Sequence, residues 1–217
     1  MHASNVVRVV PGVPSRLGYS PAAERNQQPI LASLRTLLSG ERHWRVLEIG
    51  SGTGQHAVYM TNALQNVTWY TSDLPDNLEQ INAFLAANGN DQVIRPVALE
   101  AATLHHFQEP VDVIFTANTC HIMAWQDVKR LCVNAGRCLS PGAMLVIYGP
   151  FHVGGRATSE GNYRFDLTLS QSNPWQGIRH REALIQTADQ AGFSLLRIDV
   201  MPANNQLLVL SRRRDLS

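Results

Sequence analysis

The sequence predicts a single α/β domain built on a mostly parallel, seven-stranded sheet. Apolar runs rich in β-branched residues alternate with stretches of helical periodicity, which is typical of a parallel sheet covered by helices on both faces. A glycine-rich segment separates the first predicted strand from the helix after it. The last two predicted strands have no helix between them, so they form a hairpin and one of them runs antiparallel to the rest.

The elements follow from local signals along the chain. Ser20 and Pro21 mark a helix start, because the hydroxyl caps the first turn and proline lacks the N–H that would need a partner there. We expect Pro29 to split this helix into two pieces. The strands are expected at "RVLEIG", "VTWYTSD", "QVIRPVAL", "VDVIFTAN", "AMLVIYG", "SLLRIDVM" and "QLLVLSR", and the other helices at residues 54–64, 77–89, 101–107, 125–138 and 180–191.

Two segments depart from this alternation. Residues 1–19 lack sustained periodicity and are expected to form an N-terminal arm, followed by one domain over residues 20–217. Residues 150–179 are too long for an ordinary connection, and such insertions are usually functional or disordered. Their aromatic residues Tyr163, Phe165 and Trp175 argue against disorder, so we expect a lid.

Composition points to small-molecule chemistry. Eighteen Lys and Arg against seventeen Asp and Glu give a net charge of +1, which offers no field for gathering nucleic acid or anionic membrane. The three cysteines lack metal-binding spacing, so we expect no metal and reduced core thiols. The N-terminal apolar stretches are interrupted and no later run is long enough to span a membrane, so a cytoplasmic protein is expected.

The strongest motif is "VLEIGSGTGQHA", residues 46–57. Gly50, Gly52 and Gly54 follow a strand and open a helix, where missing side chains allow a tight turn and let a nucleotide-like ligand approach the backbone. A dinucleotide fingerprint needs a further glycine where this chain has Gln55, which weakens pyrophosphate recognition. Glu48, two places before the first glycine, suits a cationic ligand instead.

Asp73 ends the second predicted strand, nineteen residues after Gly54. A carboxylate there can accept hydrogen bonds from both ribose hydroxyls of a nucleoside cofactor. The alternative is a helix cap, because "DLPDN" also begins a helix.

The blocks "SPAAERNQQPI", "EIGSGTGQH", "ANTCHI", "YGPF", "NPWQGIR" and "MPANNQLLVL" occur in this order over residues 18–213. Together they resemble the class I S-adenosylmethionine-dependent methyltransferases, and within them a methyltransferase-like subfamily catalogued as a domain of unknown function. The resemblance implies a Rossmann-like seven-stranded sheet with an antiparallel last strand, and S-adenosylmethionine as cofactor. The residues expected to bind this cofactor are Arg25, Glu48, Gly50, Ser51, Gly52, Gly54, Asp73, Leu74, Glu100 and Asn118.

Three of these positions have a second interpretation. The resemblance places Glu48 near the methionine end of the cofactor, but it could instead brace the loop. Helices before the core can fold over the cofactor in this family, so Arg25 could pair with its carboxylate or could be surface charge. Glu100 stands where the family more often has an aspartate near the adenine.

The acceptor is expected at the carboxyl ends of the later strands, where ligands of open α/β sheets bind. Asn118 and His121 follow the fourth strand and should meet Tyr148 of the fifth, so we expect catalytic roles for His121, Tyr148 and Asn205. His121 is the candidate general base, with an ordinary pKa near 6.5, or else a packed histidine. Asn204 and Asn205 precede the last strand, where they could contact the substrate or form a turn.

The sequence is therefore interpreted as a methyltransferase that transfers a methyl group from S-adenosylmethionine to a small molecule by in-line displacement. One alternative is a protein that binds S-adenosylmethionine or S-adenosylhomocysteine without turnover. Another is an oxidoreductase that uses a nicotinamide dinucleotide, against which Gln55 and Glu48 argue.

Overall fold

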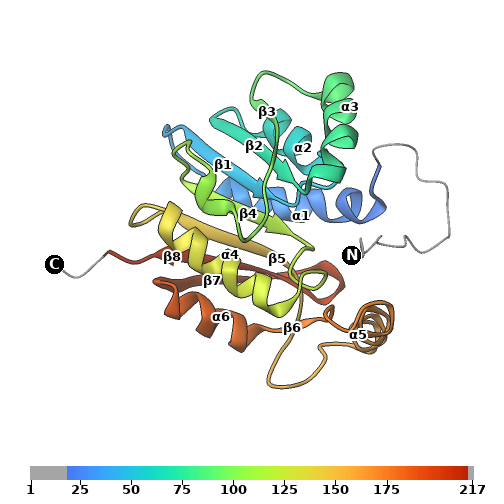
Figure 1. Cartoon of the computed structure of the whole chain (residues 1–217). Coiled ribbons are helices and arrows are strands. Elements are labelled where there is room, and N and C mark those ends of the chain that lie inside the picture. Colours follow the sequence, from blue (N-terminus) through green and yellow to red (C-terminus); the bar gives the residue numbers. More distant parts are fainter. Residues whose placement is uncertain (1–18, 215–217) are drawn as a thin grey trace, which may run out of the picture.

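The computed structural model describes residues 19–214 (Figure 1), so the expected arm lies outside the described residues except for Tyr19. The helices are α1 (Pro21–Leu37), α2 (Gln55–Ala63), α3 (Leu78–Asn88), α4 (Trp125–Cys138), α5 (Glu160–Ser172) and α6 (Arg181–Gln190). The strands are β1 (Trp44–Ile49), β2 (Val67–Asp73), β3 (Val93–Ala98), β4 (Val113–Ala117), β5 (Met144–His152), β6 (Arg179–His180), β7 (Phe193–Met201) and β8 (Asn205–Arg212). Three short 3₁₀ turns are η1 (Pro75–Asn77), η2 (Leu104–His106) and η3 (Pro202–Asn204).

The sheet has the order β3-β2-β1-β4-β5-β8-β7, and β8 runs antiparallel to both of its neighbours. The predicted Rossmann-like sheet and its antiparallel last strand are thus confirmed. The strand count differs, because β6 adds a two-residue parallel pairing with the end of β5 and makes eight strands. A strand of two residues is too short to show the alternation by which strands are recognised.

Helices cover both faces of the sheet (Figure 1). The helices α1 and α2 pack on one face, over a core that includes Trp69 and Phe115. The helices α4 and α6 pack on the other face, over a core that includes Phe151 and Phe193. Within residues 19–214, no helix is long and apolar enough to cross a membrane.

Helix α1 is continuous through Pro29, so the expected split is wrong. Proline inside a helix removes one hydrogen bond and costs about 3 kcal/mol. Ile30 and Leu34 on the C-terminal side of Pro29 are fully or almost fully buried, as is Asn26 on the N-terminal side. Packing on both sides of the proline therefore holds the helix together.

The insertion at residues 150–179 contains a helix that the sequence did not predict. Strand β5 continues to His152, a turn follows, and α5 begins after Ser159, whose hydroxyl accepts a hydrogen bond from the N–H of Asn162 at 3.1 Å. Only Asn162 and Leu169 of α5 are buried. A helix with so narrow a buried face shows little amphipathic periodicity, which is why its sequence did not indicate it.

Candidate functional site

The glycine loop lies at the point where the strand order reverses between β1 and β4, which is where ligands bind in open α/β sheets. Gly50, Gly52 and Gly54 have φ values of 72°, 60° and 79°, in the left-handed region that glycine adopts without penalty. A Cβ on Gly50 would lie 2.6 Å from the side chain of Thr119 after β4. A Cβ on Gly52 would meet nothing within 4 Å. The loop is therefore packed at its start and open in its middle.

The carboxylate of Asp73 closes this loop from the end of β2. One oxygen accepts the N–H of Gly52 at 2.7 Å, and the other accepts the N–H of Leu74 and the side-chain amide of Asn77, each at 2.7 Å. Two carboxylate oxygens offer about four acceptor positions, so about one remains for a ligand. Asp73 is thus a loop brace in this structure, and neither η1 nor α3 begins with a side-chain cap hydrogen bond. The contact of Asp73 with ribose stays a prediction.

The residues around Asp73 differ in exposure. Leu74 is 50% exposed and Glu100 is also exposed, so both can reach a ligand. Ser51 is buried, and both its N–H and its hydroxyl are hydrogen-bonded to the backbone of Ser72. The carbonyl of Ser51 accepts the N–H of Gly54 at 2.9 Å, so Ser51 joins the glycine loop to β2 and also closes the turn within the loop.

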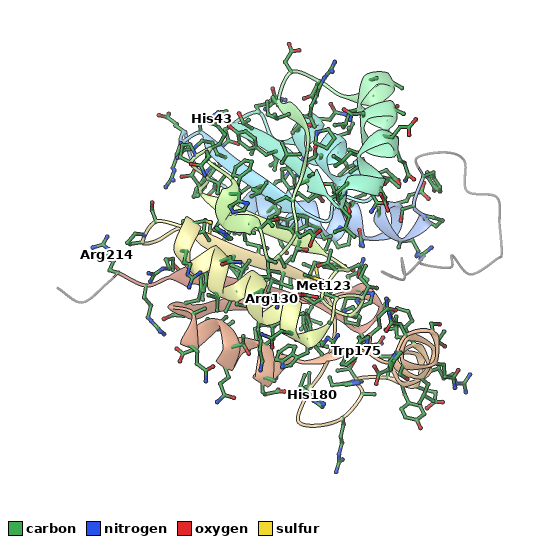
Figure 2. All side chains as sticks on the ribbon, viewed as in Figure 1. His43, Met123, Arg130, Trp175, His180 and Arg214 are labelled. Carbon is green, nitrogen blue, oxygen red and sulfur yellow. The ribbon has the colours of Figure 1, made fainter. Side chains whose placement is uncertain are left out.

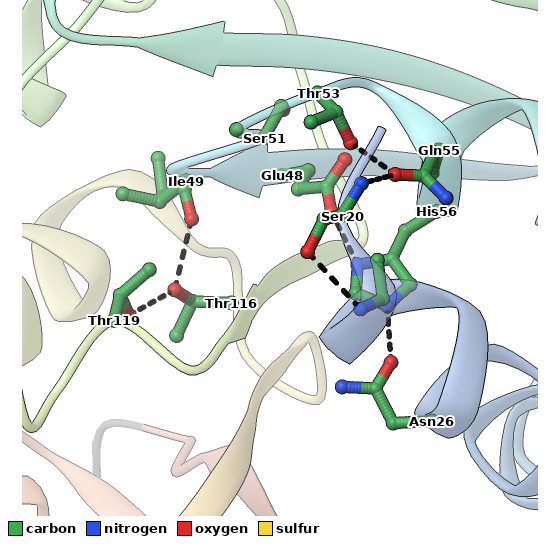
Figure 3. Close-up of polar contacts among 12 residues, drawn as sticks. Ser20, Asn26, Glu48, Ile49, Ser51, Thr53, Gln55, His56, Thr116 and Thr119 are labelled. Carbon is green, nitrogen blue, oxygen red and sulfur yellow. Dashed lines mark hydrogen bonds and ion pairs between the residues drawn. The ribbon is translucent and has the colours of Figure 1, made fainter. Parts of the chain in front are cut away.

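Gln55 has a structural role that the sequence did not reveal. Its side-chain oxygen accepts hydrogen bonds from the Thr53 hydroxyl at 2.9 Å and from the N–H of Ser20, the cap of α1 (Figure 3). The residue that breaks the dinucleotide fingerprint therefore attaches the N-terminal end of α1 to the glycine loop.

Glu48 is the centre of a buried polar chain (Figure 3). It is 1% exposed, accepts the indole N–H of Trp69 at 3.0 Å and lies 3.5 Å from Nδ1 of His56. Nε2 of His56 lies 2.6 Å from Oδ1 of Asn26, within hydrogen-bonding distance. With both oxygens of Glu48 facing protein groups, the structure supports the bracing interpretation for this residue, and its approach to a cofactor remains untested.

The buried polar chain around Glu48 continues through Asn26 to Tyr148 on β5. Burial raises the pKa of Tyr148 above its usual range, although side-chain hydrogen bonds with Asn205 and Asn26, and the charge of Arg25, act in the opposite direction. Tyr148 therefore stays protonated at neutral pH and can serve as a hydrogen-bonding group but not as a base. Arg25 itself is exposed on α1, one residue from the buried Asn26.

The two asparagines before β8 separate into different roles. Asn204 has a φ of 57°, follows Ala203 at 55°, and its carbonyl accepts the side-chain amide of Asn162 at 3.3 Å. Asn205 is extended, with a φ of −83°, and its side-chain amide donates to the carbonyl of Pro202 at 3.1 Å. Asn204 thus adopts the left-handed backbone conformation of the turn, and the side chain of Asn205 lies beside Tyr148.

The turn after β4 brings Asn118 and His121 to β5, as expected. Asn118 has a φ of 59° and donates its N–H to the carbonyl of Tyr148 at 2.9 Å. A Cβ on Gly149 would lie 3.9 Å from Oδ1 of Asn118 and 4.0 Å from Nδ1 of His121. The missing side chain of Gly149 therefore leaves room for both polar groups over the strand.

His121 is 8% exposed and its ring lies 5.2 Å from that of Phe165 on α5. Burial, and secondly the charge of Arg179, lower the pKa of His121 to about 4. The folded environment of His121 thus moves its pKa below the ordinary value near 6.5. The imidazole is neutral at pH 7 and is a weaker base than an exposed histidine.

Two hollows on the surface lie away from this edge of the sheet. One of about 210 Å³ is lined by Arg42, Asp112 and Pro141 at the opposite ends of the strands. The other, of about 470 Å³, lies between α3 and β3 beside Leu85 and Arg95. Neither includes the glycine loop or the residues around Gly149, where the functional groups converge.

Solved structures with the same fold include several methyltransferases. An O-methyltransferase family protein from Burkholderia thailandensis is 17% identical with a TM-score of 0.76, and the match covers 90% of this chain and 58% of the other. The S-adenosylmethionine-dependent methyltransferase SibL in its apo form is 21% identical with a TM-score of 0.72, with coverage of 94% and 64%. PigF with SAH is 18% identical with a TM-score of 0.73, with coverage of 85% and 55%. The chain therefore spans about three-fifths of the length of these proteins and shares their fold.

A family model described as "Protein of unknown function (DUF938)" matches residues 17–212, which is nearly the whole chain. The protein is therefore a member of the DUF938 family, with the fold of class I methyltransferases.

Proposed function

We propose that this protein transfers a methyl group from S-adenosylmethionine to a small-molecule acceptor. The observation that carries the proposal is the open glycine loop at the switch point between β1 and β4, with the carboxylate of Asp73 bonded to the N–H of Gly52. The structures that share the fold include proteins named as methyltransferases, and PigF was solved with SAH.

The residues present fit this cofactor. The space over Gly52 lets a ligand reach the backbone, and Asp73 keeps about one acceptor position for a ribose hydroxyl. Leu74 offers exposed apolar surface for an adenine, with Glu100 at the end of β3. Arg25 on the exposed side of α1 is suited to the carboxylate of the methionine portion. Gln55 occupies the fingerprint position, which disfavours a nicotinamide dinucleotide.

When bound, the cofactor supplies an electrophilic methyl group on a sulfonium. The protein contributes mainly position, because an in-line displacement needs the nucleophile close to and aligned with that methyl. Asn118, in the turn after β4, donates its N–H to the carbonyl of Tyr148 on β5, so both residues lie at the edge where the acceptor is expected. The neutral His121 can accept a proton from an acceptor that carries one at neutral pH.

The test is calorimetry of the full chain with S-adenosylmethionine, S-adenosylhomocysteine and NAD. We expect micromolar-scale binding of the first two and no heat with NAD. Heat with NAD alone would reject the proposed cofactor. Mass spectrometry of a ligand that co-purifies with the protein would identify the acceptor, and cofactor binding without any methylated product would favour a protein that binds the cofactor without turnover.

A further inference from the structure

The segment "NPWQGIR", residues 173–179, carries an arginine whose role the proposed function leaves unexplained. Arg179 lies on β6, the two-residue strand that pairs with Phe151 and His152 at the end of β5. Its side chain is about half-buried, and its guanidinium lies 6.0 Å from the ring of Trp125. An arginine placed inside the protein needs hydrogen-bond acceptors.

Those acceptors are backbone carbonyls on both sides of His121. Nε of Arg179 donates to the carbonyl of Cys120 at 2.9 Å, and Nη2 donates to the carbonyls of Met123 and, at 2.8 Å, Trp175. The N–H of Gly177 donates to the carbonyl of His121 itself at 2.9 Å. Figure 2 labels Met123 and Trp175, which lie at the end of the molecule where α5 and β6 are found.

The same segment is attached to α5 and β5. Asp166 accepts the N–H of Ile178 at 2.6 Å with one oxygen and contacts Nε2 of His152 at 3.0 Å with the other. Phe165, its neighbour on α5, packs against the ring of His121. His121 is thus held on its backbone side by β6 and on its ring side by α5.

We propose that Arg179 is a positioning residue for His121. By binding carbonyls of the turn that contains His121, Arg179 fixes the orientation of this histidine at the edge where the acceptor is expected. The proposal rests on the proposed function for the meaning of that edge, but its geometry does not depend on the cofactor. A planar fork with several donors can bind three carbonyls at once, whereas a lysine ammonium cannot reproduce that geometry.

The guanidinium also acts on His121 electrostatically. Its positive charge disfavours the imidazolium form, and burial disfavours it further. Burial lowers the pKa of Arg179 from its ordinary value, while Cys120 and Asp166 on α5 act in the opposite direction. The Cys120 thiol is itself uncharged at neutral pH, because burial raises its pKa to about 11. The histidine is therefore kept neutral well below pH 6.

The experiment is a pH titration of the His121 ring by NMR in the full chain, with the signal assigned by a His121→Gln variant. In wild type we expect a pKa of about 4. In Arg179→Met the pKa should rise toward the ordinary 6.5 without reaching it, because burial, the larger cause, remains. In Arg179→Lys the pKa of His121 should stay below its value in the methionine variant, since the positive charge is kept. The amide of Gly177 should nevertheless exchange faster in Arg179→Lys than in wild type, because the guanidinium fork is lost.

Arg181→Met is the matched control. Arg181 is a neighbouring arginine that contacts Glu182 and Gln206 and not the His121 turn, so the pKa of His121 should not change. Equal His121 pKa values in wild type and Arg179→Met, or equal shifts in the two methionine variants, would overturn the proposal. If Arg179→Met does not fold, unchanged Gly177 exchange in Arg179→Lys would overturn it instead. Calorimetry with S-adenosylhomocysteine on the same wild-type sample tests the proposed function separately.

Discussion

The two halves of the site are built in different ways. The glycine-loop half is held from β2, by the carboxylate of Asp73 on the N–H of Gly52 and by the backbone of Ser72 on Ser51. The acceptor half draws on β4, β5, β6, α5 and the corner before β8, with Arg179 bonded to carbonyls up to 59 residues away. The comparison teaches that a short motif is enough to form the glycine loop, whereas the edge where the acceptor is expected is assembled from many segments.

The largest expected effect comes from two glycines with the same backbone conformation. Gly52 has a φ of 60° and Gly154 a φ of 58°, and a Cβ on either would meet nothing within 4 Å. Valine at each position should cost about 1–2 kcal/mol of folding stability, because L side chains disfavour this conformation. Only Gly52→Val should also lose S-adenosylhomocysteine binding, by more than about 100-fold or about 2.8 kcal/mol.

Calorimetry and thermal melting measure these two effects separately. An equal loss of affinity in Gly154→Val would show that general strain, and not contact at the glycine loop, lowers cofactor binding. An unchanged affinity in Gly52→Val would remove the glycine loop from the site.

Asp73→Ala is expected to have the next largest effect. Hydrogen bonds to a charged acceptor contribute about 1.5–3 kcal/mol, so cofactor affinity should fall about 10- to 150-fold if the carboxylate also binds ribose. Melting temperature should fall as well, because three donors lose their acceptor. In Asn77→Ala the carboxylate keeps its place but loses one donor, so affinity should stay close to wild type. Lower stability with full affinity in Asp73→Ala would leave this residue as a brace only.

The smallest effect is expected at the corner before β8. Asn204→Ala should lower stability by about 1 kcal/mol, because alanine disfavours the left-handed conformation of this position, and Asn204→Gly should be neutral or slightly stabilising. Neither change should alter cofactor affinity, since Asn204 belongs to the acceptor half.

Asn205→Ala, by contrast, should raise the pKa of Tyr148, because the hydrogen bond with Asn205 lowers it, and spectrophotometric titration detects this change. No change in that pKa would leave Asn205 without a link to Tyr148.

Local sequence signals determined most of the fold. Alternating apolar runs and helical stretches were enough to predict the parallel sheet, and the missing helix between β7 and β8 was enough to predict the antiparallel strand. The glycine loop and Asp73 were also found from sequence, because a tight turn before a helix needs glycine at fixed offsets. These features depend on residues that are close in the chain or on the regular geometry of one element.

Tertiary structure decided what local signals could not show. Pro29 is helical because Asn26, Ile30 and Leu34 are buried around it, which its own preference cannot reveal. The sequence indicated Gln55 only as a departure from the dinucleotide fingerprint and gave no signal for His56, yet the two residues connect α1 to the glycine loop through Ser20 and Asn26. His121 has a lowered pKa because burial and a charge 58 positions along the chain come together only on folding. Burial and long-range electrostatics are properties of the packed molecule. The sequence was therefore enough to select candidate residues, whereas only the fold determined their burial, their hydrogen-bond partners and the pKa of His121.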